Sequence, residues 1–258
     1  MDEDSKILSE EKRDIFYSVT QKLLYITKRE RPDLETLISF LTMRVSKSTE
    51  QDWAKLKRGL SFIHGTINEK RIIGARNLLD VFTWIDASYA VHSNMRSHTG
   101  GAISMGYGVL HAKSSKQKIN VKSSTEAELV GVSEYIPHNI WLIMFLKSQG
   151  YEMRNNTVYQ DNKSAILMEK NGRNSCTGNS RHINVRYFFV KDRIDKGEFK
   201  VHYCPTLLML ADFFTKPIVG KRFRELWKVV MGQMSIFELD PSILPPIKER
   251  VGFQIEEV

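Results

Sequence analysis

Residues 81–91 read VFTWIDASYAV and place a carboxylate inside a predicted strand. The β-branched and aromatic residues around it are typical of a β-strand. The strand itself does not need Asp86, and an aspartate in such a place is most often a turn former or a helix cap. The stretch therefore predicts a strand and raises the question of what its aspartate does.

The same arrangement occurs again in TVYQDNKSAI, residues 157–166. An apolar strand runs into Asp161, and a helix is predicted directly after it. Taken singly, Asp86 and Asp161 each fit a structural turn or cap. Two strands that both end their apolar runs on aspartate make a shared site worth testing.

A third carboxylate lies in KSSTEAELVGVSEY, residues 122–135. Ser123 and Glu126 have the spacing of a capping box, which gives Glu126 a structural role. Glu128 points about 200° away from Glu126 around a helix, so it is the candidate for a site. The alternative is that Ser124 or Thr125 caps the helix and Glu128 is solvated or interacts with the helix dipole.

The fourth carboxylate is Asp212 in LLMLADFFTKP, residues 207–217. We predict one short helix at 207–214, apolar apart from this residue. Burying an unpaired carboxylate costs several kcal/mol, so Asp212 needs a cation, a hydrogen-bond donor or an opening to water. The simplest alternative is that it faces solvent.

Together, Asp86, Glu128, Asp161 and Asp212 would suit one Mg²⁺ site. Hard cations prefer oxygen ligands, and two ions about 4 Å apart hold the attacking water and the leaving oxygen of a phosphodiester. Without metal, the like charges would raise one another's pKa. The cluster therefore makes chemical sense mainly with cations bound.

The rest of the chain predicts an α/β architecture. Residues 1–77 read as helices, with a restart after Pro32 and a third helix capped by Thr49. Strands are predicted at 81–90, 101–105, 107–112, 157–160 and 199–204. Helices are predicted at 123–149 with a break at Pro137, from 162, at 184–194 and in the basic segment GKRFRELWKVV, residues 220–230.

Composition sets broad limits. The chain has 258 residues, 41% hydrophobic and 26% charged, which is typical of a globular protein. Its longest apolar run, IWLIMFL at 140–146, is far shorter than the roughly 20 residues that span a bilayer. Cys176 and Cys204 lack metal-ligand spacing and favour a reducing intracellular setting. The formal charge of +8 is compatible with a polyanionic partner.

Seven segments resemble, in order and spacing, the ribonuclease H domain of copia-type LTR retrotransposon polyproteins. They are WIDASYA, HTGGAIS, KSSTEAELVGVSEY, YQDNKSAI, SRHINVRYFFVKDRI, HYCPT and LADFFTKP. The resemblance covers about residues 78–217. Upstream, KLLYITKRERPDLETLISFL and DWAKLKRGLSFIHGTI look like the segment joining the reverse transcriptase to that domain. We therefore expect a helical connection-like segment at 1–77, a ribonuclease H-like domain at 78–217, and a basic helix with a tail at 218–258.

The resemblance implies a ribonuclease H-like fold, with a five-stranded mixed sheet flanked by helices. It also implies Mg²⁺-dependent cleavage of the RNA strand of RNA/DNA hybrids, with two ions expected and Mn²⁺ as a substitute. Carried over by position, the family's catalytic and metal-binding acids fall on Asp86, Glu128, Asp161 and Asp212. The expected partners are the hybrid and the remainder of the Pol polyprotein, without a membrane, in a cytoplasmic particle or the nucleus.

This sequence departs from the family's pattern in two ways. Many cellular relatives carry a histidine in the loop before the last acid, whereas residues 204–210 read CPTLLML. His182 matches a histidine usual in copia-type sequences, and packing or a capping contact is its expected role. No motif like Tyr-Val-Asp-Asp of the polymerases occurs, so the chain is not expected to synthesise DNA.

Basic and hydroxyl side chains precede the helix of Glu128. Free N–H groups and hydroxyls at a helix start bind phosphates or a ribose 2′-OH, and lysines add attraction that is independent of base sequence. For any one residue, a solvated lysine or a helix cap is an equal alternative. The predicted nucleic-acid-binding residues are Lys113, Lys116, Lys118, Lys122, Ser123, Ser124, Thr125 and Asn162.

Two rival functions come from other classes. A retroviral-type integrase uses a related sheet, but its glutamate follows the second aspartate, whereas the order here is Asp, Glu, Asp, Asp. The second rival is a catalytically idle retroelement fragment that at most binds nucleic acid. All four acids are present, which argues against decay at the site itself.

Overall fold

The computed structural model describes residues 5–171 and 181–243, without the side chains of 181–184 and 243. Cys176 and the tail beyond residue 243 lie outside the described residues. His182 lies in a helix, and nothing is described of its side chain.

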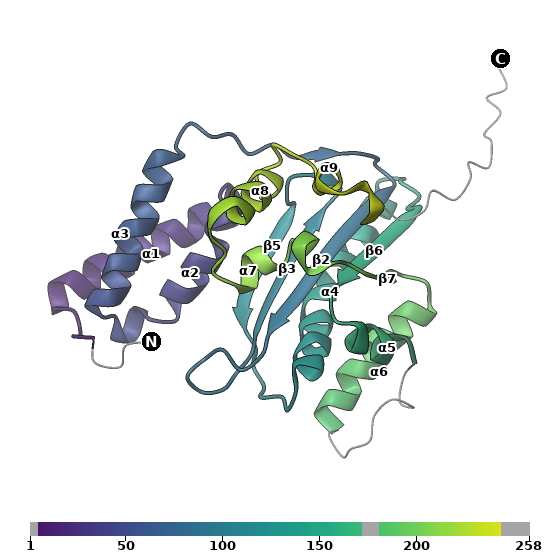
Figure 1. The fold of residues 1–258 in the computed structure, drawn as a ribbon, viewed down its shortest axis with the longest axis horizontal. Coiled ribbons are helices and arrows are strands. Elements are labelled where there is room, and N and C mark those ends of the chain that lie inside the picture. Colours follow the sequence, from purple (N-terminus) through teal and green to yellow (C-terminus); the bar gives the residue numbers. More distant parts are fainter. Residues whose placement is uncertain (1–4, 172–180, 244–258) are drawn as a thin grey trace.

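A five-stranded mixed sheet forms the centre of the fold, in the order β5-β3-β2-β6-β7 (Figure 1). Strand β3 pairs antiparallel with β2 on one side and with β5 on the other. Strand β6 pairs parallel with β2 and with β7. This sheet confirms the expected ribonuclease H-like architecture. The strand bounds are β2 (Asp80–Ser88), β3 (His98–Ser104), β5 (His111–Lys116), β6 (Asn155–Gln160) and β7 (Lys200–Tyr203).

Each face of the sheet is covered by its own helices. Because side chains alternate along a strand, Val81 and Ile85 of β2 pack against one group of helices and Phe82 and Trp84 against the other. The first group is α4 (Ser124–Ser148), α5 (Lys163–Asn171) and α6 (Arg181–Asp195). The second is α7 (Asp212–Thr215), α8 (Gly220–Val230) and α9 (Ile236–Leu239).

The N-terminal segment forms a helical layer with its own small core. Its helices are α1 (Glu10–Arg29), α2 (Glu35–Thr42) and α3 (Glu50–Gly65). Thr49 caps α3 in a capping box, as predicted. The layer packs on the second face of the sheet domain, where Thr36 Oγ1 donates to the carbonyl of Phe213 and Trp227 Nε1 donates to Asp33.

The prediction of a single strand at 107–112 is wrong, because two separate strands, β4 (Gly106–Tyr107) and β5, lie in this region. Strand β4 pairs instead with Gly74–Ala75 (β1) in a separate two-stranded sheet, and the main sheet resumes at His111. Gly108 lies in the left-handed region with φ +68°, and its Cα packs so closely on the carbonyl of Ile72 that a side chain would overlap it. The chain therefore turns where an unbroken strand was expected.

The predicted helix break at Pro137 is also wrong. Helix α4 continues through Pro137, which is exposed. Packing outweighs the lost hydrogen bond, because Ile136 and Ile143 are buried against the sheet. Asn139 is fully buried and hydrogen-bonds Thr83 and Asn156, which ties the second half of the helix to two strands.

By length and composition, α4 is also the one helix among the described residues that could cross a membrane. Ten of its residues are buried in the fold, as in the core helix of a folded domain.

Candidate metal centre

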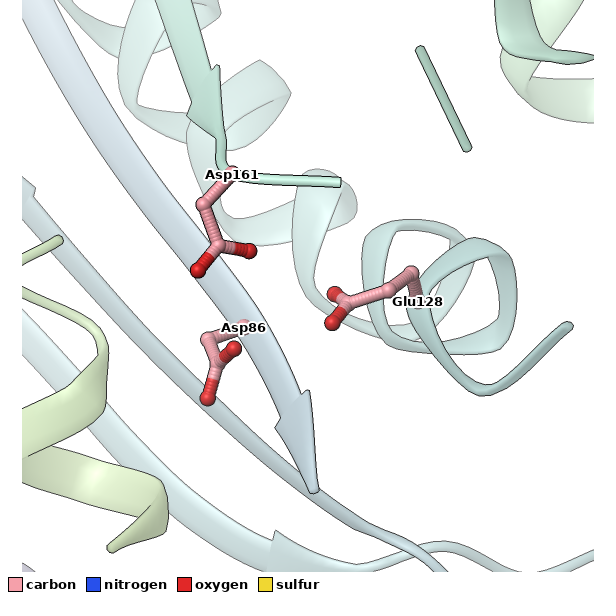
Figure 2. A group of neighbouring side chains, drawn as sticks. All are labelled: Asp86, Glu128 and Asp161. Atoms are coloured by element: carbon pink, nitrogen blue, oxygen red, sulfur yellow. The ribbon is translucent and has the colours of Figure 1, made fainter. Parts of the chain in front are cut away.

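Three carboxylates from separate elements meet at one edge of the sheet (Figure 2). Asp86 comes from β2, Asp161 follows β6, and Glu128 points at both from α4. One oxygen of each lies within 4.8 Å of one oxygen of the others. Clustered carboxylate oxygens are the ligands that hard divalent cations prefer.

Strand register explains why Asp86 and Asp161 meet. Trp84 of β2 lies opposite Tyr159 of the parallel strand β6. Each aspartate follows two residues later, so both side chains emerge at the same end and on the same side of neighbouring strands. The two aspartates, which end similar stretches of sequence, therefore also occupy equivalent positions on neighbouring strands.

The start of α4 directs Glu128 into the centre. The Ser123 hydroxyl accepts the N–H of Glu126 at 3.2 Å, and the Glu126 carboxylate accepts the N–H of Lys122 at 2.7 Å. Glu126 thus has the predicted structural role, although it binds the residue before the cap. Glu128 is 5% exposed, so the alternative that it is solvated is wrong.

Burial and mutual repulsion disfavour charge on two of these acids. Burial raises the pKa of Asp86 to about 6, with Asp212 and Asp161 adding to the rise and Lys216 opposing it. The pKa of Glu128 lies well above its usual value, through burial first and then Asp86 and Asp161.

One oxygen of Glu128, Oε2, is buried without a hydrogen-bond partner among the described residues. An oxygen-rich centre with an orphaned buried carboxylate oxygen fits a bound divalent cation.

Asp212 lies outside this group of three, and its carboxylate is paired with two basic side chains. It is fully buried at the start of α7, so the alternative that it faces solvent is wrong. Its carboxylate forms ion pairs with Lys216 and Arg222. The predicted single helix at 207–214 is in fact a 3₁₀ turn, Thr206–Leu208, followed by α7.

Residues after Asp212 connect it to Asp86. Lys216 Nζ lies 3.5 Å from the Asp86 carboxylate, and the Thr215 hydroxyl donates to the same carboxylate. Thr215 approaches β3 at Gly100, where an added Cβ would lie 2.6 Å from Thr215 Cγ2. Thr215, Lys216 and Arg222 were not predicted as site residues. The spacing of Asp212 and Lys216, i and i+4, was the available signal for one of these contacts.

The predicted nucleic-acid-binding residues come from several elements. Lys113 and Lys116 both lie on the edge strand β5, but they are three positions apart, so they project from opposite faces. Lys118, Lys122 and Ser124 are exposed, while Ser123 and Thr125 are half-buried.

Asn162, which directly follows Asp161, has a structural contact of its own. Its side-chain oxygen accepts the N–H of Ala165 at 3.0 Å and so caps α5.

A pair of histidines near the centre was also missed. His92 Nε2 lies 3.0 Å from His98 Nδ1, and His98 Nε2 lies 2.7 Å from the Ser114 hydroxyl. Burial lowers the pKa of His98 to about 4, with His92 adding to the effect. The imidazole of His92, in the loop after β2, and that of His98, the first residue of β3, therefore lie together beside the segment around α7.

Comparisons with known proteins identify homologues among transposon polyproteins. No protein-family model matches the chain. It is 28% identical over 221 residues to the retrovirus-related Pol polyprotein from transposon TNT 1-94 of Nicotiana tabacum, covering 85% of this chain and 16% of that protein. The polyprotein from transposon RE1 of Arabidopsis thaliana is 29% identical over 196 residues, covering 75% and 13%. The resemblance to copia-type Pol polyproteins is confirmed, and the chain spans about one sixth or less of the relatives it matches.

Solved structures give weaker similarity. A ribonuclease H1 isolated from compost is 11% identical, covers 50% of this chain and 86% of its own, and superimposes with a TM-score of 0.35. A foamy viral protease-reverse transcriptase in complex with an RNA/DNA hybrid is 14% identical, covers 83% and 29%, and gives a TM-score of 0.47. The fold assignment rests on the strand order and directions described above.

Proposed function

From its homology to transposon Pol polyproteins, we propose that this chain is a metal-dependent endonuclease that cleaves the RNA strand of RNA/DNA hybrids during reverse transcription. The observation that carries the proposal is the meeting of Asp86, Glu128 and Asp161 within 4.8 Å. Repulsion and burial raise the pKa of two of these acids, so the arrangement is stabilised by a cation. The remainder of a Pol polyprotein is the proposed partner, because the chain matches only a small part of its relatives.

Asp86, Glu128 and Asp161 would hold Mg²⁺, with Mn²⁺ as a substitute. When bound, the metal supplies Lewis-acid stabilisation of the phosphodiester and lowers the pKa of an attacking water. Thr215 orients the Asp86 carboxylate by a hydrogen bond, and Thr206 does the same for Asp161 at 3.1 Å. These two hydroxyls restrict the rotation of their carboxylates, which preorganises the donor set.

The Asp212 carboxylate would join the metal centre only after its ion pairs with Lys216 and Arg222 are broken. Lys216 and Arg222 now occupy both of its oxygens. Substrate phosphates are suitable alternative acceptors for an ammonium and a guanidinium. The second of the two expected ions is therefore proposed to bind together with the substrate.

The start of α4 is the proposed contact for the nucleic-acid strand. Lys122 and Ser124 are exposed beside the helix that carries Glu128. Free N–H groups and hydroxyls there would bind a phosphate or the 2′-OH that distinguishes RNA from DNA. Lys113 and Lys116 lie on opposite faces of β5, so at most one of them is proposed to share this contact.

The direct test is cleavage of a labelled RNA strand in an RNA/DNA hybrid by the purified chain in Mg²⁺. We expect internal cuts in the RNA, none in the DNA, and none in the presence of EDTA. A folded chain that binds the hybrid but leaves the RNA intact in both Mg²⁺ and Mn²⁺ would instead support the idle binding module. Circular dichroism establishes folding before the assay is interpreted.

A further inference from the structure

A cavity of about 590 Å³ lies between the N-terminal helices and the second face of the sheet domain. Its walls come from α2 and α3, from the loop after β2, and from the segment around α7. Thr215 and Lys216 line it and also contact Asp86, so the cavity directly adjoins the metal centre. Its volume lies in the range of small-molecule sites, roughly 300–1,000 Å³.

The cavity has an aromatic and aliphatic lining. Phe40, Phe213 and Phe223 bring rings from three different elements, and the rings of Phe213 and Phe223 stack with their centroids 5.4 Å apart. Leu37 and Ile218 also line the cavity. Flat rings stack on such phenylalanine side chains with little dependence on their exact substituents. A ligand with a planar ring system fits this lining.

The charges at the cavity favour an anion. Lys55 Nζ lies 4.4 Å from the centroid of the Phe40 ring. Lys216 also lines the cavity, but its ammonium is already paired with Asp86 and Asp212. Asp33 is the acid of the lining, and its carboxylate is occupied by Arg31 and by Trp227 Nε1.

We propose that this cavity is a nucleotide-binding site, which takes an aromatic base against the phenylalanine rings and a phosphate at Lys55. A planar ring joined to an anion matches the apolar lining and the ammonium of Lys55, which forms no ion pair with a carboxylate among the described residues. The site binds without the metal centre, because none of its ring contacts involves Asp86, Glu128 or Asp161. The proposal is therefore independent of nuclease activity.

The test measures binding to the full chain in EDTA, which removes any contribution from a metal ion. The aromatic anion 8-anilinonaphthalene-1-sulfonate becomes fluorescent in the cavity, and adenosine 5′-monophosphate displaces it. We expect displacement to need at least about ten-fold higher concentrations of adenosine or of inorganic phosphate, since each lacks one half of the contacts. Equal displacement by inorganic phosphate, or none by the nucleotide, would overturn the proposal.

Two variants locate the binding. Val91 is 52% exposed at the cavity rim, and Val91→Trp should fill the opening and weaken nucleotide binding by about ten-fold or more. Val219→Trp is the matched control, because Val219 is 75% exposed and does not line the cavity. Lys55→Gln tests the anion contact separately and should also weaken binding. Unchanged affinity in both Val91→Trp and Lys55→Gln would show that the nucleotide binds elsewhere.

Discussion

The ammonium of Lys216 lies 3.5 Å from the carboxylate of Asp86 and also forms an ion pair with Asp212. Burial alone would lower the pKa of Lys216, but Asp86, Asp212 and Asp161 together raise it, so the side chain stays protonated at neutral pH. Lys216 is therefore an internal cation at the edge of the three-carboxylate centre, where it would compete with a bound metal ion for Asp86.

Replacing this cation should strengthen metal binding. Lys216→Met removes a positive charge beside Asp86, and we expect Mn²⁺ to bind about five- to ten-fold more tightly, since the side chain is partly exposed and its repulsion is screened. Isothermal titration calorimetry measures the affinity. Lys221→Met is the control, because Lys221 is 85% exposed and pairs with Glu225. Weaker Mn²⁺ binding in Lys216→Met would contradict competition at Asp86.

Asp161 is expected to be essential for cleavage. Asp161→Asn keeps the shape of the side chain and its contact with Thr206, but removes a charged ligand. RNA cleavage in a hybrid should fall by about a thousand-fold or more, with hybrid binding still measurable in a gel-shift assay. Asp195→Asn, at an exposed position on α6, should retain full activity. Normal cleavage by Asp161→Asn would remove Asp161 from the mechanism.

Metal affinity should fall at acidic pH. The pKa of Asp86 is about 6, and that of Glu128 lies well above its usual value, so protons compete with the cation for both ligands. As the pH decreases through about 6, we expect Mn²⁺ binding to weaken and to release more protons per ion bound. Calorimetry in two buffers of different ionisation enthalpy measures both quantities. An affinity that is constant from about pH 5 to pH 8 would refute this linkage.

Glu169 should make stability depend on pH. It is fully buried, burial raises its pKa to about 8, and neither of its oxygens has a hydrogen-bond partner among the described residues. The folded state therefore binds more protons than the unfolded state between the ordinary glutamate pKa and about 8, so stability is lost as pH rises through that window. Glu169→Gln should remove this loss and be more stable than the original chain by about 2 kcal/mol at alkaline pH.

Urea denaturation at acidic and at alkaline pH measures the difference. The exposed Glu152→Gln is the control and should leave the pH dependence unchanged. A Glu169→Gln variant with the original dependence would show that another group is responsible.

Gly100 should be intolerant of a side chain. An added Cβ would lie 2.6 Å from Thr215 Cγ2 and 2.9 Å from the carbonyl oxygen of Ala211. Gly100→Ala should push α7 away from Asp86 and cost about 1–3 kcal/mol in unfolding free energy. Thermal denaturation compares it with Gly65→Ala, where nothing lies within 4 Å of the new methyl group. Equal stability of the two variants would show that α7 adjusts without cost.

Local pattern predicted the elements but misplaced their ends. The strand containing Asp86 and the cap at Thr49 were confirmed because β-branched runs and capping spacings are local properties. The strand predicted at 107–112 failed because Gly108 must approach Ile72, and the break at Pro137 failed because Ile136 and Ile143 hold α4 on the sheet. Both errors arise from contacts between residues distant in sequence.

The sequence by itself determined the candidate acids: two aspartates at strand ends, a glutamate released by the capping role of Glu126, and a fourth acid in an apolar segment. Tertiary structure decided how these acids are used. The register of β2 with β6 brings Asp86 to Asp161, while the approach of Thr215 to Gly100 puts Lys216 between Asp86 and Asp212. Neither relationship has a local signal, because each depends on which strands become neighbours and on which backbones lie close together.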